Sequence, residues 1–566
     1  MSEMLNRRIA LAATIFSLLP ATQAQEVSQS GLRIESARAM VAQPARAQKV
    51  MVASVHELAT EAGLEILKKG GNAVDATVAV AFVLGVVHPE AGNLGGSGYL
   101  LLRTAAGQVT AVDYAGTAPT GSRPGMFQDP GDSQIGYKSA AVPGTPGGMG
   151  LIHSKYGKLK WKDCLEPARR LASSGFPASQ RMELILKLQV PVMRKFPETA
   201  RVFLHGAETP LKQDELVRQP ELAATIKRMQ QKGWREFYEG ETARRIAEDM
   251  KASGGLITLD DLRGYQATEV EPLKVVYRGH PVLTMPPSSS GGVALGVMLN
   301  VMDRYPLELG REGSGLARHL QIEAMRRGFV ARNRVMGSSD ERAVADSVLL
   351  PAYTDRVTGN LRTNRATPPP AAKAAPNKAA PKESPDTTHF TIIDGAGTIV
   401  TNTYTLSGFY GSQVIAKGTG VLLNNHMSVF GNAQAQKTLA PGKRYPSTMA
   451  PTIILRPDNT PLAAIGTPGG ATIPSTLFQI ITNLVDFKMS LRDAVEFPRL
   501  HFAGTQVEAE PAALIYDIAE LLKSMGHKLN EQYRSQGDVQ AVMIEEKTGW
   551  RVGWSDGRRG GAVRGF

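Results

Sequence analysis

The sequence predicts an α+β protein, because stretches with helical periodicity and stretches rich in β-branched residues occupy different parts of the chain. Residues 52–89 carry apolar side chains at helical spacing, with a break at Gly70 and Gly71, which predicts two consecutive helices. A glycine-rich turn then leads into an apolar strand. Residues 147–350 are mainly helical in pattern, and strands return in the last third of the chain.

The length and composition place the chain among globular proteins. Its 566 residues are 42% hydrophobic and 20% charged, enough for two to four domains with a large core. At the N-terminus, Arg7 and Arg8 precede an apolar run, and small residues at Thr22 and Ala24 suit cleavage. We therefore expect a signal peptide over residues 1–24 and a periplasmic or secreted protein.

Several classes of function are excluded by simple counts. The apolar run 73–87 contains Asp75 and is shorter than the roughly 20 residues of a membrane span, so we predict a buried helix there. The single cysteine, Cys164, allows no intrachain disulfide and is expected in the core. Ten scattered histidines predict no metal site and no cofactor. The net charge of +12 comes without a concentrated basic run, so we predict no nucleic-acid partner.

A change of composition divides the chain near residue 386. Residues 367–385 hold six prolines and almost no apolar bulk, which predicts an exposed tether. Strand-like sequence begins directly afterwards. The chain thus reads as a large part, 25–386, that ends in the tether, followed by a small part, 387–566.

The first strands after the tether form a predicted hairpin that brings two threonines together. The turn sequence "DGAGT" separates two β-branched segments. If Asp394 pairs with Thr398, then Thr387 lies opposite Thr405. A cross-strand threonine pair is also ordinary sheet stabilisation, worth roughly 0.2–1 kcal/mol.

The tether suggests a chemical role for this pair. Cleavage between Asp386 and Thr387 would give a threonine that carries both a hydroxyl and a free α-amine. With a reference pKa of about 7.7, the amine is partly unprotonated near neutral pH and can act as the general base. Thr405 is then expected to hydrogen-bond the Thr387 hydroxyl.

A glycine pair further along the chain can supply donors for a developing oxyanion. The pattern predicts a strand over residues 461–466, a turn at Gly469 and Gly470, and then a helix. Glycine allows close approach, and the helix end adds positive potential. The alternative is a tight turn with only a structural role.

Motifs along nearly the whole chain carry a family resemblance. In order, they are "GGNAVDATVAV", "HPEAGNLGGSGYLLL", "AVPGTPGG", "GGLITLDDLRGY", "MPPSSSGG", "TTHFTIID", "TYTLSGFYGS", "GVLLNNHMSVF", "PSTMAPTI", "GTPGGA" and "SDGRRGG". The chain resembles the gamma-glutamyltranspeptidase family of N-terminal-nucleophile hydrolases. The resemblance implies a four-layer αββα fold formed by both subunits, a precursor that cleaves itself before Thr387, and a heterodimer of the two processed parts.

The resemblance also implies roles for individual residues. Thr387 matches the family nucleophile and Thr405 its hydroxyl partner, while Gly469 and Gly470 match the glycines of the oxyanion hole. Substrate-binding residues are expected at four further positions: Ser447 and Thr448, which match the paired serines that hold the donor's α-carboxylate, and Ser407 and His426.

Four positions depart from the family pattern at the donor's amino-acid head group. Ala115 stands in place of the carboxylate-binding arginine, Val429 in place of the aspartate that binds the α-ammonium, His426 in place of Gln or Glu, and Ser407 in place of an asparagine. An unpaired desolvated ammonium is costly, so these changes should weaken binding of a γ-glutamyl zwitterion.

Other side chains can restore the lost charges from different positions. By proximity in sequence to the altered motifs, Arg103 and Arg444 are the candidates. His389, two residues from Thr387, lies on the same sheet face, but no acid is placed to orient it, so a packing or substrate-lining role is expected.

Three functions follow. The first is an exported, self-cleaving threonine amidase that acts on γ-glutamyl compounds such as glutathione and passes the acyl group to water, an amino acid or a peptide. The second keeps this mechanism but uses a glutaryl, oxamate-like or more apolar acyl group. The third is a periplasmic binding protein without turnover, against which the intact Thr387, Thr405, Gly469 and Gly470 argue.

Overall fold

The computed structural model describes residues 43–566, except residues 93, 207, 307–311, 337, 369–385 and 531–534. The predicted signal peptide and nearly all of the predicted tether lie outside the described residues.

Two antiparallel sheets, each of seven strands within the described ranges, lie face to face. The β12 sheet carries the predicted hairpin, and its strand order is β23 (Ala562–Gly565), β2 (Met51–Ser54), β12 (Asp386–Ile393), β13 (Ile399–Ser407), β3 (Ser97–Arg103), β4 (Val109–Tyr114) and β9 (Thr268–Val270). The β17 sheet has the order β1 (Ala45–Ala47), β22 (Arg551–Ser555), β21 (Gln540–Ile544), β17 (Pro461–Ile465), β16 (Thr452–Leu455), β11 (His280–Thr284) and β10 (Leu273–Tyr277).

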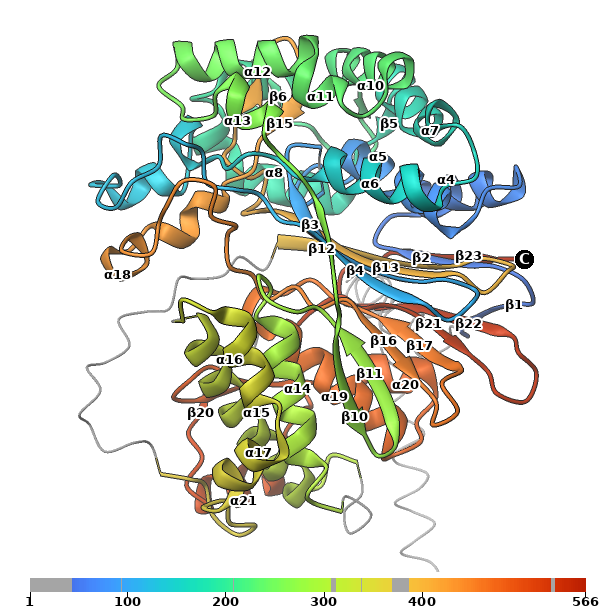
Figure 1. Cartoon of the computed structure of the whole chain (residues 1–566), viewed down its shortest axis with the longest axis vertical. Coiled ribbons are helices and arrows are strands. Elements are labelled where there is room, and N and C mark those ends of the chain that lie inside the picture. The colour runs from blue at the N-terminus through green and yellow to red at the C-terminus, as the bar shows by residue number, and fades with distance from the viewer. Residues whose placement is uncertain are drawn as a thin grey trace, which may run out of the picture. The chain divides into compact units, whose positions relative to one another are not determined.

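Helices cover the outer face of each sheet (Figure 1). On the side of the β12 sheet lie α4 (Glu57–Lys68), α5 (Ala73–Val87), α6 (Thr145–Tyr156), α7 (Trp161–Ser174), α8 (Gln180–Met193), α9 (Pro197–Phe203), α10 (Pro220–Lys232), α11 (Glu236–Glu239), α12 (Glu241–Ala252) and α13 (Leu259–Arg263). On the side of the β17 sheet lie α14 (Gly291–Met302), α15 (Gly315–Met336), α16 (Glu341–Val348), α17 (Pro351–Thr358), α19 (Ile473–Val485), α20 (Leu491–Glu496) and α21 (Tyr516–Ser524). The predicted α+β class and the four αββα layers are confirmed.

Short elements complete the described chain. They are β5 (Phe176–Pro177), β6 (Leu204–His205), β7 (Thr209–Pro210), β8 (Leu216–Val217), β14 (Ile415–Ala416), β15 (Val421–Leu422), α18 (Ala433–Gln436), β18 (Leu500–Phe502), β19 (Val507–Ala509) and β20 (Leu529–Asn530), with 3-10 turns between them.

The predicted helical pair is confirmed, with α4 and α5 separated at the two glycines. Every residue of α5 is buried, which explains why its sequence is apolar on all sides. The Asn72 side chain caps the start of α5, and the Asp75 carboxylate accepts a hydrogen bond from the Asn72 backbone amide, which completes a capping box. Among the described residues, none of the helices is both long and apolar enough to span a bilayer.

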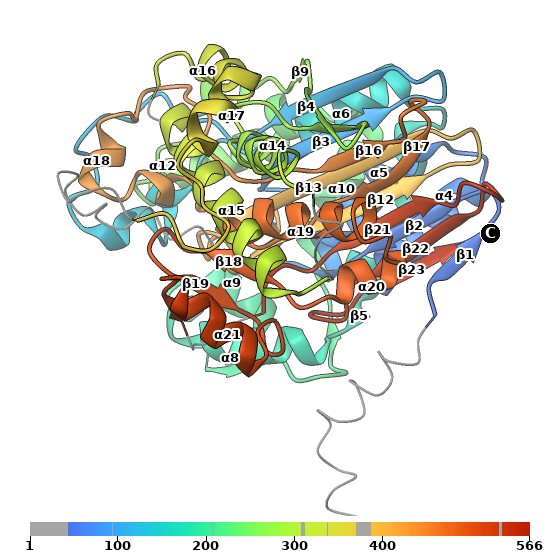
Figure 2. The ribbon, with the colours of Figure 1, turned by 90° about the horizontal axis from the view of Figure 1, so that it is seen from below.

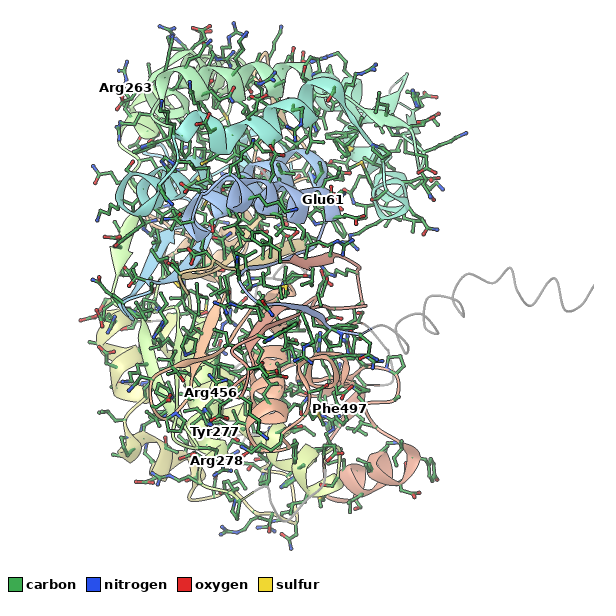
Figure 3. The ribbon with its side chains drawn as sticks, turned by 90° about the vertical axis from the view of Figure 1, so that its right-hand side faces the viewer. Glu61, Arg263, Tyr277, Arg278, Arg456 and Phe497 are labelled. Carbon is green, nitrogen blue, oxygen red and sulfur yellow. The ribbon has the colours of Figure 1, made fainter. Side chains whose placement is uncertain are left out.

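The β17 sheet is fastened to helix α19, whose N-terminal end lies next to the predicted glycine turn. Tyr277 and Arg278, at the turn between β10 and β11, both bind Asp486 just after α19, with 3.0 Å from Arg278 Nε to Asp486 Oδ1. Figure 3 shows Tyr277 and Arg278 near each other on the side of the β17 sheet. Seen from below, α14, α15 and α19 lie together over this sheet (Figure 2). These contacts attach the C-terminal end of α19 to the turn between β10 and β11.

Candidate active site around residues 386 and 387

The hairpin places the two threonines as predicted. Thr387 pairs with Thr405 across β12 and β13, and the Asp394 amide donates to the Thr398 carbonyl at 3.1 Å. The ladder register shifts between Asp386 and Thr387, so the bond predicted to be cleaved lies at an irregularity of the strand. Both threonine side chains are buried.

In this uncleaved chain the Thr405 hydroxyl is directed at the carbonyl of Asp386, the residue before Thr387, rather than at the Thr387 hydroxyl. Thr405 Oγ1 donates to Asp386 O at 2.8 Å and accepts from the Ser407 amide at 2.8 Å. Ser407 itself adopts a φ of 82°, in the left-handed region that costs a non-glycine residue strain. The carbonyl between Asp386 and Thr387 is therefore polarised by a fixed donor.

Strand β17, a glycine turn and α19 follow one another as predicted. Gly469 has a φ of 138° and Gly470 a φ of 57°, conformations that favour glycine. The Thr448 hydroxyl donates to Gly470 O at 2.8 Å and so holds the turn. Thr448, expected to contact a donor carboxylate, thus has its proton committed to the backbone in this structure.

A cavity of about 240 Å³ connects the two features. It is lined by Arg181, Asp386, Phe409, Gly469, Thr472, Ser535, Gly537 and Arg559. The structure thus brings Asp386, from the predicted cleavage site, to the same cavity as Gly469, from the predicted oxyanion turn. Arg181 and Arg559 were not selected from the sequence.

A different arginine, Arg444, binds the backbone at Ala115, the position that holds an arginine in the family. Ala115 is fully buried, and Arg444 Nη1 donates to its carbonyl oxygen at 3.0 Å and to Asp113 Oδ1 at 3.1 Å. Asp113 also accepts from the Ala115 amide at 2.9 Å and from Ser288 Oγ at 2.8 Å. Although burial acts in the opposite direction, Asp113 raises the pKa of Arg444. Arg444 is near the site, as its place in the sequence suggested, but its charge is already paired.

Arg103 lies at the wrong end of the sheet for a role at Thr387. In the pairing of β3 with β13, Arg103 faces Ile399, whereas Ser97 faces Thr405. Arg103 Nη2 donates to Asn459 O at 3.3 Å. The idea that it binds a donor carboxylate is therefore wrong, because seven-residue β3 separates it from the hydroxyl pair.

At the altered position 426 the structure shows an aromatic stack. His426 is fully buried and stacks on Tyr445 with ring centroids 4.0 Å apart, and its Nδ1 lies 3.3 Å from Ser97 Oγ. Burial lowers the pKa of His426 to about 3, so the imidazole is neutral at physiological pH. Val429 belongs to the same 3-10 turn, residues 426–430. Ser447 Oγ accepts from the Met449 amide at 3.1 Å.

His389 fills the space between the two sheets. Its ring nitrogens contact Thr403 Oγ1 at 2.8 Å and Thr391 and Thr401 Oγ1 at 3.1 Å each. Burial lowers its pKa to about 3. A Cβ added at Gly466 would lie 2.1 Å from the ring, so the imidazole packs against the opposite sheet. This agrees with the expected packing role.

A group of potential metal ligands, Asp75, His153 and Cys164, also comes together in the fold. The Asp75 carboxylate, which would supply the oxygen ligand, already accepts hydrogen bonds from the backbone amides of Asn72, Lys158 and Leu159 at 2.9–3.1 Å. Burial, followed by the Asp75 charge, raises the pKa of the Cys164 thiol. These residues join the α5 cap to the loop before α7, and Cys164 lies in the core as predicted.

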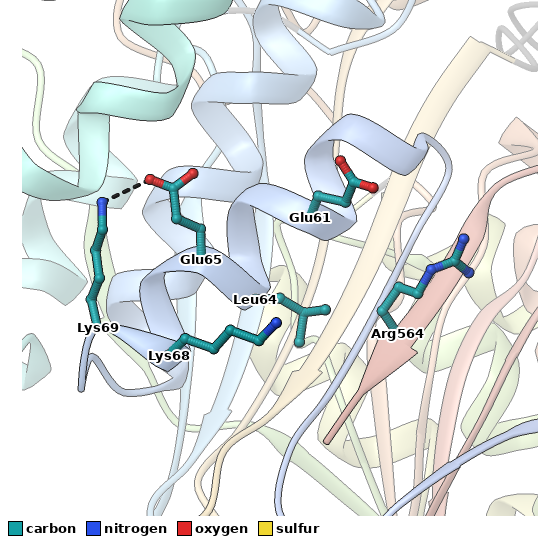
Figure 4. A pocket seen from close by; sticks show the side chains of 6 residues that line it. All are labelled: Glu61, Leu64, Glu65, Lys68, Lys69 and Arg564. Carbon is teal, nitrogen blue, oxygen red and sulfur yellow. Dashed lines mark hydrogen bonds and ion pairs between the residues drawn. The ribbon is translucent and has the colours of Figure 1, made fainter.

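A second cavity, of about 620 Å³, lies on the surface between α4 and β23 (Figure 4). Its lining consists of Glu61, Leu64, Glu65, Lys68, Lys69 and Arg564, and Lys69 pairs with Glu65 at 2.7 Å. It includes none of the predicted site residues.

The two facing sheets with helices on both outer sides, and a threonine at the start of a central strand, define the class of N-terminal-nucleophile hydrolases. Residues 59–566 match the family model for gamma-glutamyltranspeptidase, and the chain belongs to this family of enzymes.

Known relatives have two kinds of name. The glutathione hydrolase proenzyme of Escherichia coli (strain K12) is 34% identical over 564 residues, which cover 95% of each chain. The acylase ACY 1 proenzyme of Pseudomonas sp. (strain V22) is 32% identical over 515 residues, covering 88% of this chain and 90% of the relative. The crystal structure of cephalosporin acylase from Bacillus halodurans has a TM-score of 0.83 at 27% identity and covers 93% of this chain and 97% of that one.

Proposed function

We propose that this protein is an exported threonine amidase that cuts its own chain between Asp386 and Thr387 and then transfers acyl groups through Thr387. The observation that carries the proposal is the 2.8 Å hydrogen bond from Thr405 Oγ1 to the carbonyl oxygen of Asp386. Attack of Thr387 Oγ on this carbonyl turns its oxygen into an oxyanion, which a hydroxyl donor at this distance stabilises.

The first reaction is an acyl shift followed by hydrolysis. A C–O bond forms from Thr387 Oγ to the Asp386 carbonyl carbon, the peptide C–N bond breaks, and the hydroxyl proton passes to the released amine. Water then hydrolyses the ester, which leaves large and small subunits that stay associated because β12 remains between β2 and β13. The new α-amine serves as the general base in later turnovers.

In each later turnover the Thr387 hydroxyl attacks a substrate amide carbonyl. Thr405 positions that hydroxyl, and the Gly469 and Gly470 amides are proposed to stabilise the tetrahedral oxyanion. The leaving amine takes a proton, and water or an acceptor amine resolves the acyl-enzyme. Burial lowers the pKa of both His426 and His389 to about 3, which makes each imidazole a poor proton acceptor near neutral pH, so the α-amine of Thr387 is the proposed base.

Two acyl donors are consistent with this machinery. The names of several relatives favour a γ-glutamyl group, such as that of glutathione. The altered positions favour the second candidate, an acyl group without the α-ammonium, because Val429 replaces the aspartate that binds the ammonium in the family and neutral His426, stacked on Tyr445, replaces the usual Gln or Glu. The relatives named acylase are in keeping with this candidate.

Denaturing electrophoresis tests the self-cleaving mechanism. The purified protein is expected to run as two fragments divided before Thr387, and Thr387→Ala as one chain. A wild-type chain that stays whole would contradict the proposal.

The donor is tested separately by comparing a γ-glutamyl anilide with its glutaryl counterpart, which differs by the α-amine. The glutaryl compound is expected to have the higher kcat/KM. Clear preference for the γ-glutamyl anilide would restore the first donor.

A further inference from the structure

Two arginines from distant elements enter the cavity that contains Asp386. Arg181 lies at the start of α8, and Arg559 lies in the loop before β23. Burial lowers the pKa of Arg559, and the negative charges of Asp538 and Asp386 counteract this effect. The like charge of Arg181 lowers it further, so the two guanidinium groups are electrostatic neighbours.

Acidic groups outside the cavity lining also lie near these arginines. Arg181 Nε is 3.5 Å from Glu90 Oε1, and Glu90 is also bound by His88 Nδ1 at 3.1 Å. Burial and the neighbouring Asp556 raise the pKa of Asp538 to about 8.

Asp556 is held by other arginines. Its carboxylate is 2.7 Å from Arg499 Nη2 and 3.0 Å from Arg558 Nη1. Among the described residues that line the cavity, Asp386 alone carries a carboxylate. The Asp386 side chain is therefore the acid that the cavity presents to Arg181 and Arg559 before cleavage.

The chemistry of self-cleavage relates this position to the substrate. When Thr387 Oγ has attacked the preceding carbonyl, Asp386 is the acyl group of an ester on Thr387. A substrate acyl-enzyme has the same ester bond on the same oxygen. Because Gly469 of the proposed oxyanion turn lines the same cavity as Asp386, the side chains around the Asp386 carboxylate are within reach of the corresponding part of a substrate acyl chain. The atoms from the Asp386 carbonyl carbon to its carboxylate form the skeleton of a succinyl group.

We propose that Arg181 and Arg559 bind the terminal carboxylate of a short dicarboxylic acyl group, succinyl or glutaryl, at the place that Asp386 occupies before cleavage. This assignment rests on the proposed function. When the segment that ends at residue 386 leaves after cleavage, Arg181 and Arg559 lose the Asp386 carboxylate. The carboxylate of an incoming acyl group then forms charge-assisted hydrogen bonds with the same two arginines. Arginine suits this role because its planar group binds a carboxylate with two parallel bonds.

The same pair explains a preference against an α-ammonium. A γ-glutamyl group presents a carboxylate at the distance of a glutaryl group, but it adds a cation beside Arg181 and Arg559. Apart from Asp386, none of the described residues that line the cavity carries a carboxylate to pair with this cation. A chain that lacks the family arginine at Ala115 can thus still recognise a dicarboxylic acyl group, through arginines that come from other elements.

The test uses the processed full-length enzyme and anilides of glutaric, succinic and valeric acid. The valeryl compound matches the glutaryl chain but has a methyl group in place of the carboxylate. The measured quantity is the ratio of kcat/KM for glutaryl over valeryl anilide, per amount of small subunit. Wild-type enzyme is expected to favour glutaryl, and Arg181→Gln to lower the ratio at least about 30-fold.

Matched variants separate specificity from folding and processing. Arg559→Lys keeps the charge but loses the paired hydrogen bonds, and a smaller fall in the ratio than for Arg559→Gln is expected. Arg103→Gln, at the far end of β3, is expected to leave the ratio unchanged.

Two outcomes distinguish failure of the carboxylate site from failure of the amidase function. A cleaved enzyme that hydrolyses anilides with the same ratio in wild type and Arg181→Gln would overturn the carboxylate site and leave the amidase function intact. A chain that stays uncut and hydrolyses none of the anilides would overturn both.

Discussion

The hydroxyl of Thr405 offers the sharpest test of how the chain prepares its own cleavage. The variant Thr405→Val keeps the shape of the side chain and removes the hydrogen bond of 2.8 Å to the Asp386 carbonyl. Loss of a single oxyanion donor typically slows acyl transfer by about 10²–10³-fold. We expect self-cleavage of the variant to slow by this factor, measured as the disappearance of the full-length band with time after purification.

Part of any effect will be a loss of stability, because the variant also deprives the Ser407 amide of its acceptor. The Ser407 amide is half-buried, so leaving it unsatisfied costs at most about 1–3 kcal/mol. Thr403→Val is the matched control. Thr403 is buried two residues away on the same face of β13, and its hydroxyl contacts His389 Nδ1 at 2.8 Å instead of the cleavage site.

The control variant is expected to lose stability and to cleave at the wild-type rate. If Thr405→Val cleaves as fast as wild type, or if both variants slow equally, the hydroxyl does not stabilise the developing charge and the reasoning is refuted.

Two further predictions concern buried groups. Because the folded pKa of Asp538, about 8, lies above its unfolded value, the unfolded chain loses this proton first and folding stability falls as the pH rises from about 4 to 8. The variant Asp538→Asn has no proton to lose, so its stability does not fall over this pH range. The difference in urea midpoint between the variant and wild type should therefore be larger at about pH 8 than at about pH 5, and an equal difference at the two pH values would contradict the raised pKa. Gly466→Ala places a Cβ 2.1 Å from the His389 ring and should destabilise by about 1–3 kcal/mol in thermal unfolding, whereas unchanged stability would show that the ring can move.

The sequence predicted the parts of the site that depend on local order. The turn between Asp394 and Thr398 sets the register, and the alternation of side chains along two strands then pairs Thr387 with Thr405. The strand, glycine turn and helix around Gly469 are equally local, and they were predicted for the same reason.

The remaining parts depend on long-range packing that no local pattern reveals. Arg181 comes from a helix in the first half of the chain and Arg559 from its last residues, and only the closed fold brings them to one cavity. The sequence suggested Arg103 because it is near the altered motif, yet the direction of β3 carries it to the opposite end of the sheet. The "SDGRRGG" segment was the one signal that pointed towards Arg559.

The proposed mechanism requires that Thr387 becomes the first residue of a separate chain. Intact-mass measurement of the denatured, active protein tests it most directly. We expect a fragment with the mass of residues 387–566 and an unmodified α-amine. A single polypeptide in which residues 386 and 387 remain joined, in material that hydrolyses amides, would contradict it.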